Sequence, residues 1–164
     1  MAGAQSIDNF YMDNAITKAA SYTGSKFNIF GAKELIFTWD ITAAERDSGN
    51  ETYDLYITTY DNFGAWDIAH FSQVLSTGAK RFVAIVKCGP SIVPQEITTA
   101  TPGVSANMSG TLKVDTAGSN EGTTTLAAGK VRHGALGERI GSELVIAGTV
   151  VTGISYSLTC VAKY

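Results

Sequence analysis

Apolar and polar residues alternate along several short stretches of the chain, which is the pattern of half-buried β-strands. Residues 33–42 place one apolar set on a single face, namely Leu35, Phe37, Trp39 and Ile41. Residues 52–59 repeat the alternation, with Tyr53, Leu55 and Ile57 opposed to Asp54, Tyr56 and Thr58. The charged, turn-forming segment 43–51 predicts an exposed loop through which these two strands pair.

Further strand-like stretches follow at residues 66–74, 80–87, 111–115, 123–126, 130–133, 143–151 and 153–163. Residues 82–86 are apolar on both faces, so we expect a central strand that is covered on two sides. Many short strands, without a convincing helical pattern of ten residues, predict an all-β fold. We expect a single antiparallel β-sandwich or jelly-roll-like domain. A short helix within residues 12–20 stays open as an alternative.

Two segments stand apart from the strand pattern. Residues 1–25 form a candidate N-terminal arm, and residues 89–105 hold all three prolines. Each half of the chain would have only about 75 residues, marginal for independent folding. We therefore expect one domain over residues 26–164, with 89–105 as a crossover loop or arm. Apolar residues in both segments need burial, and a neighbouring subunit is a candidate: Ile7, Phe10, Tyr11, Ile92, Val93 and Ile97. Packing of both segments on their own subunit is the alternative.

Composition and charge narrow the classes of partner. The chain has 164 residues, of which 16% are charged, and a formal net charge of −3. This balance provides no basic stripe to neutralise phosphates, so we expect no nucleic-acid partner. The longest weakly polar stretch, 144–151, is far shorter than the roughly 20 residues that span a bilayer, so we expect no membrane partner. The first ten residues lack the basic and apolar regions of a secretory signal, so we expect synthesis in the cytoplasm.

Residue types that carry chemistry are scattered. His70 and His133 lie far apart, and Cys88 and Cys160 have no ligand-spaced neighbour, so we expect free buried thiols and no metal or cofactor. An acidic group suggests calcium but lacks the spacing of an EF-hand, so a solvated loop tip is the preferred interpretation: Asp40, Glu45, Asp47, Glu51 and Asp54. No GxSxG motif is present. We therefore expect no catalytic residue and no enzyme activity.

One aromatic loop is of more interest, and it contains Tyr60, Asp61, Asn62, Phe63 and Trp66. Aromatic rings beside a carboxylate and an amide suit sugar recognition, because a ring stacks on C–H faces while polar groups hold hydroxyls. Tyrosine and tryptophan are also enriched at protein interfaces. Packing in the protein's own core, a subunit interface and a glycan site all remain open for this loop.

The segments 35–54, 66–71 and 77–82 resemble small structural proteins of tailed bacteriophages, and head decoration or cement proteins in particular. The resemblance covers roughly residues 33–87 and includes no catalytic motif. It implies a β-rich protein, made in the host cytoplasm, that binds the outside of a capsid and stabilises it against internal DNA pressure. Such proteins commonly act as trimers.

We therefore predict a non-enzymatic virion protein that binds the outer head surface as a symmetric homo-oligomer. A trimer is the expected state, and the major capsid protein lattice is the expected partner. The alternative is a tail-associated β-sandwich that binds a glycan or receptor through the aromatic loop.

Overall fold

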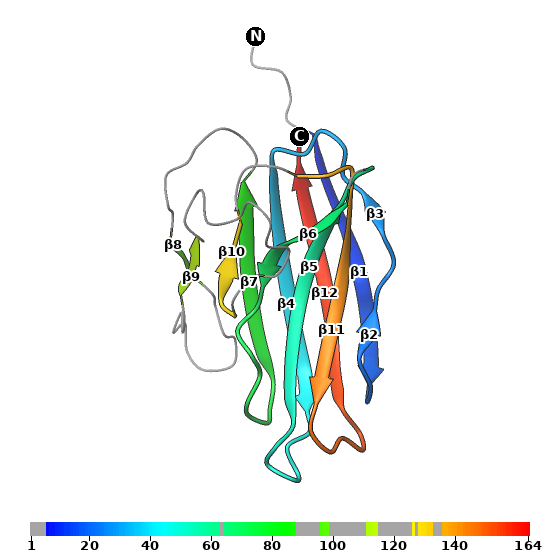
Figure 1. The fold of residues 1–164 in the computed structure, drawn as a ribbon, viewed down its shortest axis with the longest axis vertical. Coiled ribbons are helices and arrows are strands. Elements are labelled where there is room, and N and C mark those ends of the chain that lie inside the picture. Colours follow the sequence, from blue (N-terminus) through cyan, green and yellow to red (C-terminus); the bar gives the residue numbers. More distant parts are fainter. Residues whose placement is uncertain are drawn as a thin grey trace.

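β-Strands provide all the regular structure of the described residues, and none of those residues is helical (Figure 1). A computed structural model describes residues 6–62, 64–87, 96–98, 111–114, 126, 128–132 and 136–164. The strands are β1 (Ile7–Lys18), β2 (Tyr22–Thr23), β3 (Phe27–Asn28), β4 (Glu34–Ala44), β5 (Thr52–Tyr60), β6 (Ala65–His70), β7 (Lys80–Lys87), β8 (Glu96–Thr98), β9 (Thr111–Val114), β10 (Lys130–Val131), β11 (Arg139–Ala147) and β12 (Ile154–Lys163).

The strands form two sheets that pack face to face. Sheet A has the order β1-β12-β4-β7, and sheet B has the order β2-β11-β5-β6-β10-β9-β8, with β3 also paired to β11. All pairs are antiparallel except β9 with β10. The expected all-β antiparallel sandwich is confirmed.

The core lies between the sheets, where alternate side chains of each strand point inward. On β12 the inward set is buried: Ile154, Tyr156, Leu158, Cys160 and Ala162. Trp39 on β4 lies at the centre, with its ring centroid 5.5 Å from Phe82, 5.6 Å from Phe71 and 6.1 Å from Tyr156. A fully buried aromatic cluster of this kind dominates the burial of apolar surface in a domain of this size.

The expected hairpin of residues 33–42 with 52–59 is wrong. Both segments are strands, but β4 pairs with β12 and β7 in sheet A, while β5 pairs with β11 and β6 in sheet B. The connection crosses from one sheet to the other, and hydrogen bonds hold it there. The Glu45 carboxylate accepts hydrogen bonds from the backbone N–H groups of Val151, Thr152 and Gly153 in the β11–β12 loop.

The prediction of a solvated acidic loop holds only for its tip, residues 47–50, which is exposed. Glu45 and Glu51 are buried, and Arg46 donates to the carbonyl oxygens of Gly49 and Glu51. The amide hydrogen bonds, led by that of Gly153, lower the pKa of Glu45 despite its burial. Among the described residues no group of acidic, histidine or cysteine side chains has the arrangement of a metal site.

The expectation of a central strand at 82–86 is also wrong. β7 ends the strand order of sheet A, and its burial alternates, with Phe82, Ala84 and Val86 buried and Ile85 only half-buried. Its second apolar face lies on the outside of the sandwich. The central strands of sheet A are β4 and β12, each paired on both sides.

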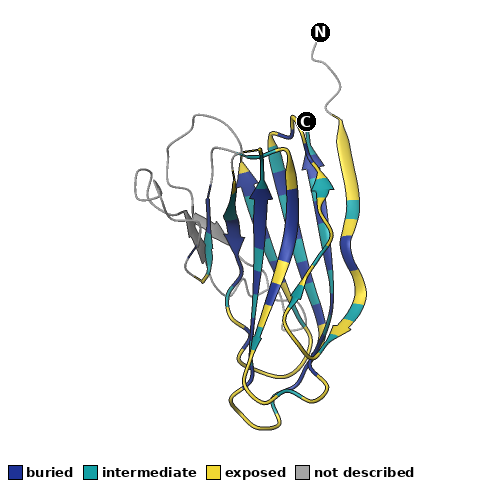
Figure 2. Ribbon diagram, turned by 45° about the vertical axis from the view of Figure 1, so that its right-hand side comes forward, coloured by how far each residue is buried: buried dark blue, intermediate teal, exposed yellow. Residues whose placement is uncertain are grey.

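The N-terminal segment does not form a short helix, nor a free arm over residues 7–18. These residues form β1, an edge strand that pairs with β12 from Ile7 to Lys18 (Figure 2, mostly exposed at the right-hand edge). Inside the sandwich, Asp13 of β1 is buried and accepts hydrogen bonds from Ser142 of β11 and Tyr156 of β12. Burial raises the pKa of Tyr156, which keeps its hydroxyl a donor to Asp13.

The Pro-containing segment 89–105 is described only at β8, which pairs with β9. The expectations for Ile92 and Val93 lie outside the described residues, as do those for His133 and Cys88. Ile97 is within β8, and its side chain is not described. Cys160 is a free buried thiol, as expected.

Candidate functional site

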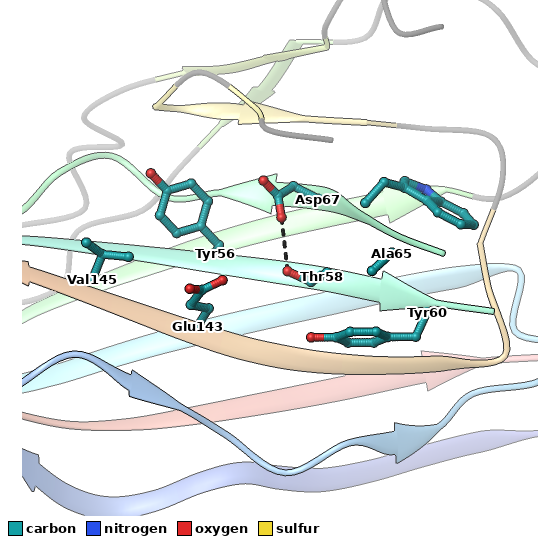
Figure 3. Close-up of a pocket in the computed structure, with 8 residues that line it drawn as sticks. Tyr56, Thr58, Tyr60, Ala65, Asp67, Glu143 and Val145 are labelled. Atoms are coloured by element: carbon teal, nitrogen blue, oxygen red, sulfur yellow. Dashed lines mark hydrogen bonds between the residues drawn. The ribbon is translucent and has the colours of Figure 1, made fainter. Parts of the chain in front are cut away.

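A shallow groove of about 430 Å³ lies on the outer face of sheet B, away from the core (Figure 3). Its floor is Thr58 of β5, with Tyr56 and Tyr60 on either side along the same strand. Residues two apart on a strand point to the same face, so β5 presents all three outward. β6 and β11 complete the lining with Ala65, Trp66, Asp67, Glu143 and Val145.

Tyr56 is held rigidly at one end of the groove. Its ring stacks on that of His70 at a centroid distance of 3.9 Å and an interplanar angle of 24°. The two nitrogen atoms of His70 are themselves engaged, Nδ1 at 2.8 Å from the carbonyl oxygen of Leu126 and Nε2 at 3.1 Å from Asp54 Oδ1. Asp54 also accepts a hydrogen bond from Gln73. This buried network fixes the orientation of the tyrosine ring.

Asp67 forms one long wall of the groove. Its carboxylate accepts hydrogen bonds from the Thr58 hydroxyl at 2.9 Å and from the Leu126 backbone N–H at 3.3 Å. Burial raises the pKa of Asp67, and these hydrogen bonds offset only part of that rise. A carboxylate has about four lone-pair positions, so Asp67 keeps acceptor capacity for a ligand.

Tyr60 closes the other end of the groove in a fixed position. Its ring lies against Gly141 of β11, where an added Cβ would be 3.2 Å from Tyr60 Cε2. The Lys26 ammonium lies 3.9 Å from the ring centroid, in a cation–π contact. Because Lys26 covers one face of the ring, Tyr60 serves the groove as an end wall rather than as an open stacking surface.

Glu143 lies opposite Asp67 across the groove, directly beside Tyr56 in the strand register. Its side chain is exposed, and no described residue gives it a hydrogen bond or an ion pair. The groove therefore has an acidic side chain on each long wall, and none of its lining residues is basic.

The structure brings together only part of the predicted aromatic loop. Tyr60 and Trp66 line the groove, but Asp61 accepts a hydrogen bond from Gly64 and holds the turn. Asn62 is exposed and outside the groove lining, and Phe63 lies outside the described residues.

Sequence reasoning did not select Tyr56, Asp67 or Glu143 as site residues. The alternation within residues 52–59 already placed Tyr56 and Thr58 on the outward face, and this was a usable signal. No local sequence signal pointed to Glu143, because its position beside Tyr56 depends on the pairing of β5 with β11.

Comparison with known proteins does not assign the chain to a group: no protein-family model matches it, and no curated protein gives a significant match. Among the described residues there is no helix long and apolar enough to cross a membrane.

Proposed function

We propose that the chain is a non-enzymatic structural protein of a bacteriophage virion, which binds the outer head surface as a symmetric homo-oligomer and stabilises it. The observation that carries the proposal is an apolar band on the outer face of sheet A. The resemblance of residues 33–87 to head decoration proteins gives the class of partner. The expected partner is the major capsid protein lattice.

The band is a set of apolar and threonine side chains that the register aligns in two rows, the first across β12, β4 and β7 and the second across all four strands of sheet A. One cross-strand row is Val161, Ile36 and Ile85, and the next is Tyr11, Thr159, Thr38 and Val83. These side chains alternate with the inward set of each strand and none is fully buried, although Ile85 also packs against the core. We call these seven residues the sheet A band.

Charged side chains border the band on both sides along the strands. Lys163 pairs with Glu34 at one border, and Arg81 pairs with Asp40 at 2.8 Å at the other. An apolar centre with a polar rim is the arrangement of protein–protein interfaces. A stable interface buries about 1,600 Å² in total, and repeated attachment to a lattice multiplies weaker contacts.

The edge strand β1 supports self-association. Of the three N-terminal interface candidates, Ile7 and Tyr11 are 59% and 56% exposed, whereas Phe10 turns inward and stacks on Phe27 at 5.1 Å. β1 has no partner on its outer side among the described strands. The backbone groups on that outer side are therefore available to pair with a neighbouring subunit. We expect a trimer.

Binding to heads that lack the chain tests the proposal. Ile36→Lys places a charge in the centre of the band and is expected to reduce co-sedimentation with heads at least tenfold. Val145→Lys is the control, because it introduces a lysine at an outward apolar position of sheet B, and it should bind heads normally. Normal binding of Ile36→Lys, or absence of the chain from purified virions, contradicts the proposal.

The oligomeric state is tested separately by light scattering at micromolar concentration. The expected mass is that of three chains, and Tyr11→Lys should lower it. A sharp monomer mass for the unaltered protein contradicts a preassembled trimer.

A further inference from the structure

We propose that the groove on the outer face of sheet B binds a neutral oligosaccharide. Tyr56 acts as the stacking surface, and Asp67 and Glu143 accept hydrogen bonds from sugar hydroxyls. This inference does not depend on the head-binding role, which uses the opposite face of the sandwich. It applies equally to a protein attached to a head or to a tail.

The first step is the shape of the groove. Tyr56 and Tyr60 are four residues apart on β5, which separates them by roughly 13 Å at about 3.3 Å per residue. The groove is open along this direction, with Thr58 as its low floor (Figure 3). This length fits an extended ligand of more than one sugar ring.

The second step is the mixture of rings and acceptors. Aromatic faces stack on the C–H faces of sugars, and carboxylates are strong acceptors for hydroxyl donors. Asp67 retains acceptor capacity beside its bond to Thr58, and Glu143 is exposed and unengaged by the described residues. Donors from a ligand would therefore meet an acceptor on either side of the floor.

The third step favours a neutral ligand. Asp67 and Glu143 repel phosphate, sulfate and sialic acid groups placed between them. A compact cation would need rings that converge on one point, but the two tyrosines stand at opposite ends, and Tyr60 already contacts the Lys26 ammonium.

The fourth step is preorganisation. His70 supports the ring of Tyr56, Gly141 and Lys26 hold Tyr60, and Thr58 orients Asp67. Fixed side chains lose little conformational entropy on binding, which increases affinity for a given contact area.

An array of neutral, sialylated and sulfated oligosaccharides, with choline as a cationic probe, tests the inference on the full chain. We expect binding to neutral oligosaccharides only, followed by titration of the strongest one by calorimetry. Glu143→Gln should weaken that binding about tenfold, the usual effect of losing a hydrogen bond to a charged acceptor. Tyr56→Ala should weaken it at least as much.

Glu138→Gln is the matched control, because Glu138 is also an exposed glutamate but does not line the groove. It should bind the oligosaccharide like the unaltered protein.

If Tyr56→Ala fails to fold, Glu143→Gln still tests the inference. The Glu143 side chain is exposed and forms no hydrogen bond or ion pair with the described residues, so its replacement should leave the fold intact. Three results would overturn the inference. They are binding of choline or acidic glycans alone, no binding to any neutral glycan, and binding of a neutral glycan that Glu143→Gln leaves unchanged. Head binding should be normal in Glu143→Gln, so failure of this inference and failure of the head-binding proposal are distinguishable.

Discussion

Two isoleucines on the same strand provide a matched test of which face of sheet A is inside. Ile41 and Ile36 both lie on β4, and their side chains point to opposite faces. Ile41 is fully buried in the core, whereas Ile36 is half-buried in the sheet A band between Val161 and Ile85. Each is replaced by alanine, so that the chemical change is identical.

The structure predicts very different costs. Ile41→Ala leaves a cavity in the core and should destabilise the fold by about 2–5 kcal/mol. Ile36→Ala loses only two cross-strand contacts, at about 0.2–1 kcal/mol each, so a loss of about 1 kcal/mol is expected. With a urea dependence of about 2 kcal/mol/M, the unfolding midpoints should fall by about 1–2.5 M and about 0.5 M respectively.

Urea unfolding followed by tryptophan fluorescence gives both midpoints, since buried Trp39 reports on the core. Equal losses for the two variants would refute the assignment of faces. They would show that the sheet A band is covered within the monomer. The proposal that this band is a docking surface would then have no basis.

Three further outcomes follow from the local structure. Because the amide N–H groups at Gly153 and its two preceding residues lower the pKa of Glu45, the stabilisation is present above the ordinary pKa of a glutamate and is lost as the pH falls through the lowered value. Glu45→Gln should therefore lower the urea midpoint at pH 7, and the difference should shrink below about pH 4; a difference that stays constant contradicts this role. Gly153→Ala should destabilise far more than Gly49→Ala, because both have positive φ but only at Gly153 would the new Cβ meet backbone, 1.9 Å from the Lys18 oxygen; similar urea midpoints would be inconsistent with that close approach. Burial raises the pKa of the Cys160 thiol to about 12, so peptide mapping should find Cys160 unmodified by iodoacetamide in the folded protein and modified in urea; rapid labelling of the folded chain would show that β12 opens.

Local alternation predicted the strands well but not their partners. The inward faces of β4, β5 and β12 follow directly from period-two patterns, because each residue's side depends only on the pleat. The partner of a strand depends on contacts distant in sequence. β4 and β5 are adjacent in the chain, yet the carboxylate of Glu45 ties their connection to the loop after β11, about 100 residues away, and so the two strands enter different sheets.

The same reasoning explains the error at β7. A strand that is apolar on both faces is normally covered on both faces. Here Phe82 and Val86 face the core, while Ile85 and Val83 continue the outward band across from Ile36 and Thr38. Sequence alone does not separate burial inside a domain from a surface that is kept for a partner.

The sequence pointed to only some of the residues that line the candidate groove. Tyr60 and Trp66 stood out because aromatic residues cluster there in sequence. Asp67 looked like an ordinary strand residue until its hydrogen bond to Thr58 and its burial were known. Glu143 enters the groove only through the pairing of β11 with β5, which no local pattern reveals.

Electron cryomicroscopy of virions that carry the chain tests the head-binding proposal most directly. The proposal predicts density for the β-sandwich at symmetry-related positions on the outside of the head. The sheet A band should face the shell, and the groove with Tyr56 and Glu143 should face outward. Density for the chain in the tail, or a sandwich that contacts the shell through sheet B, would contradict it.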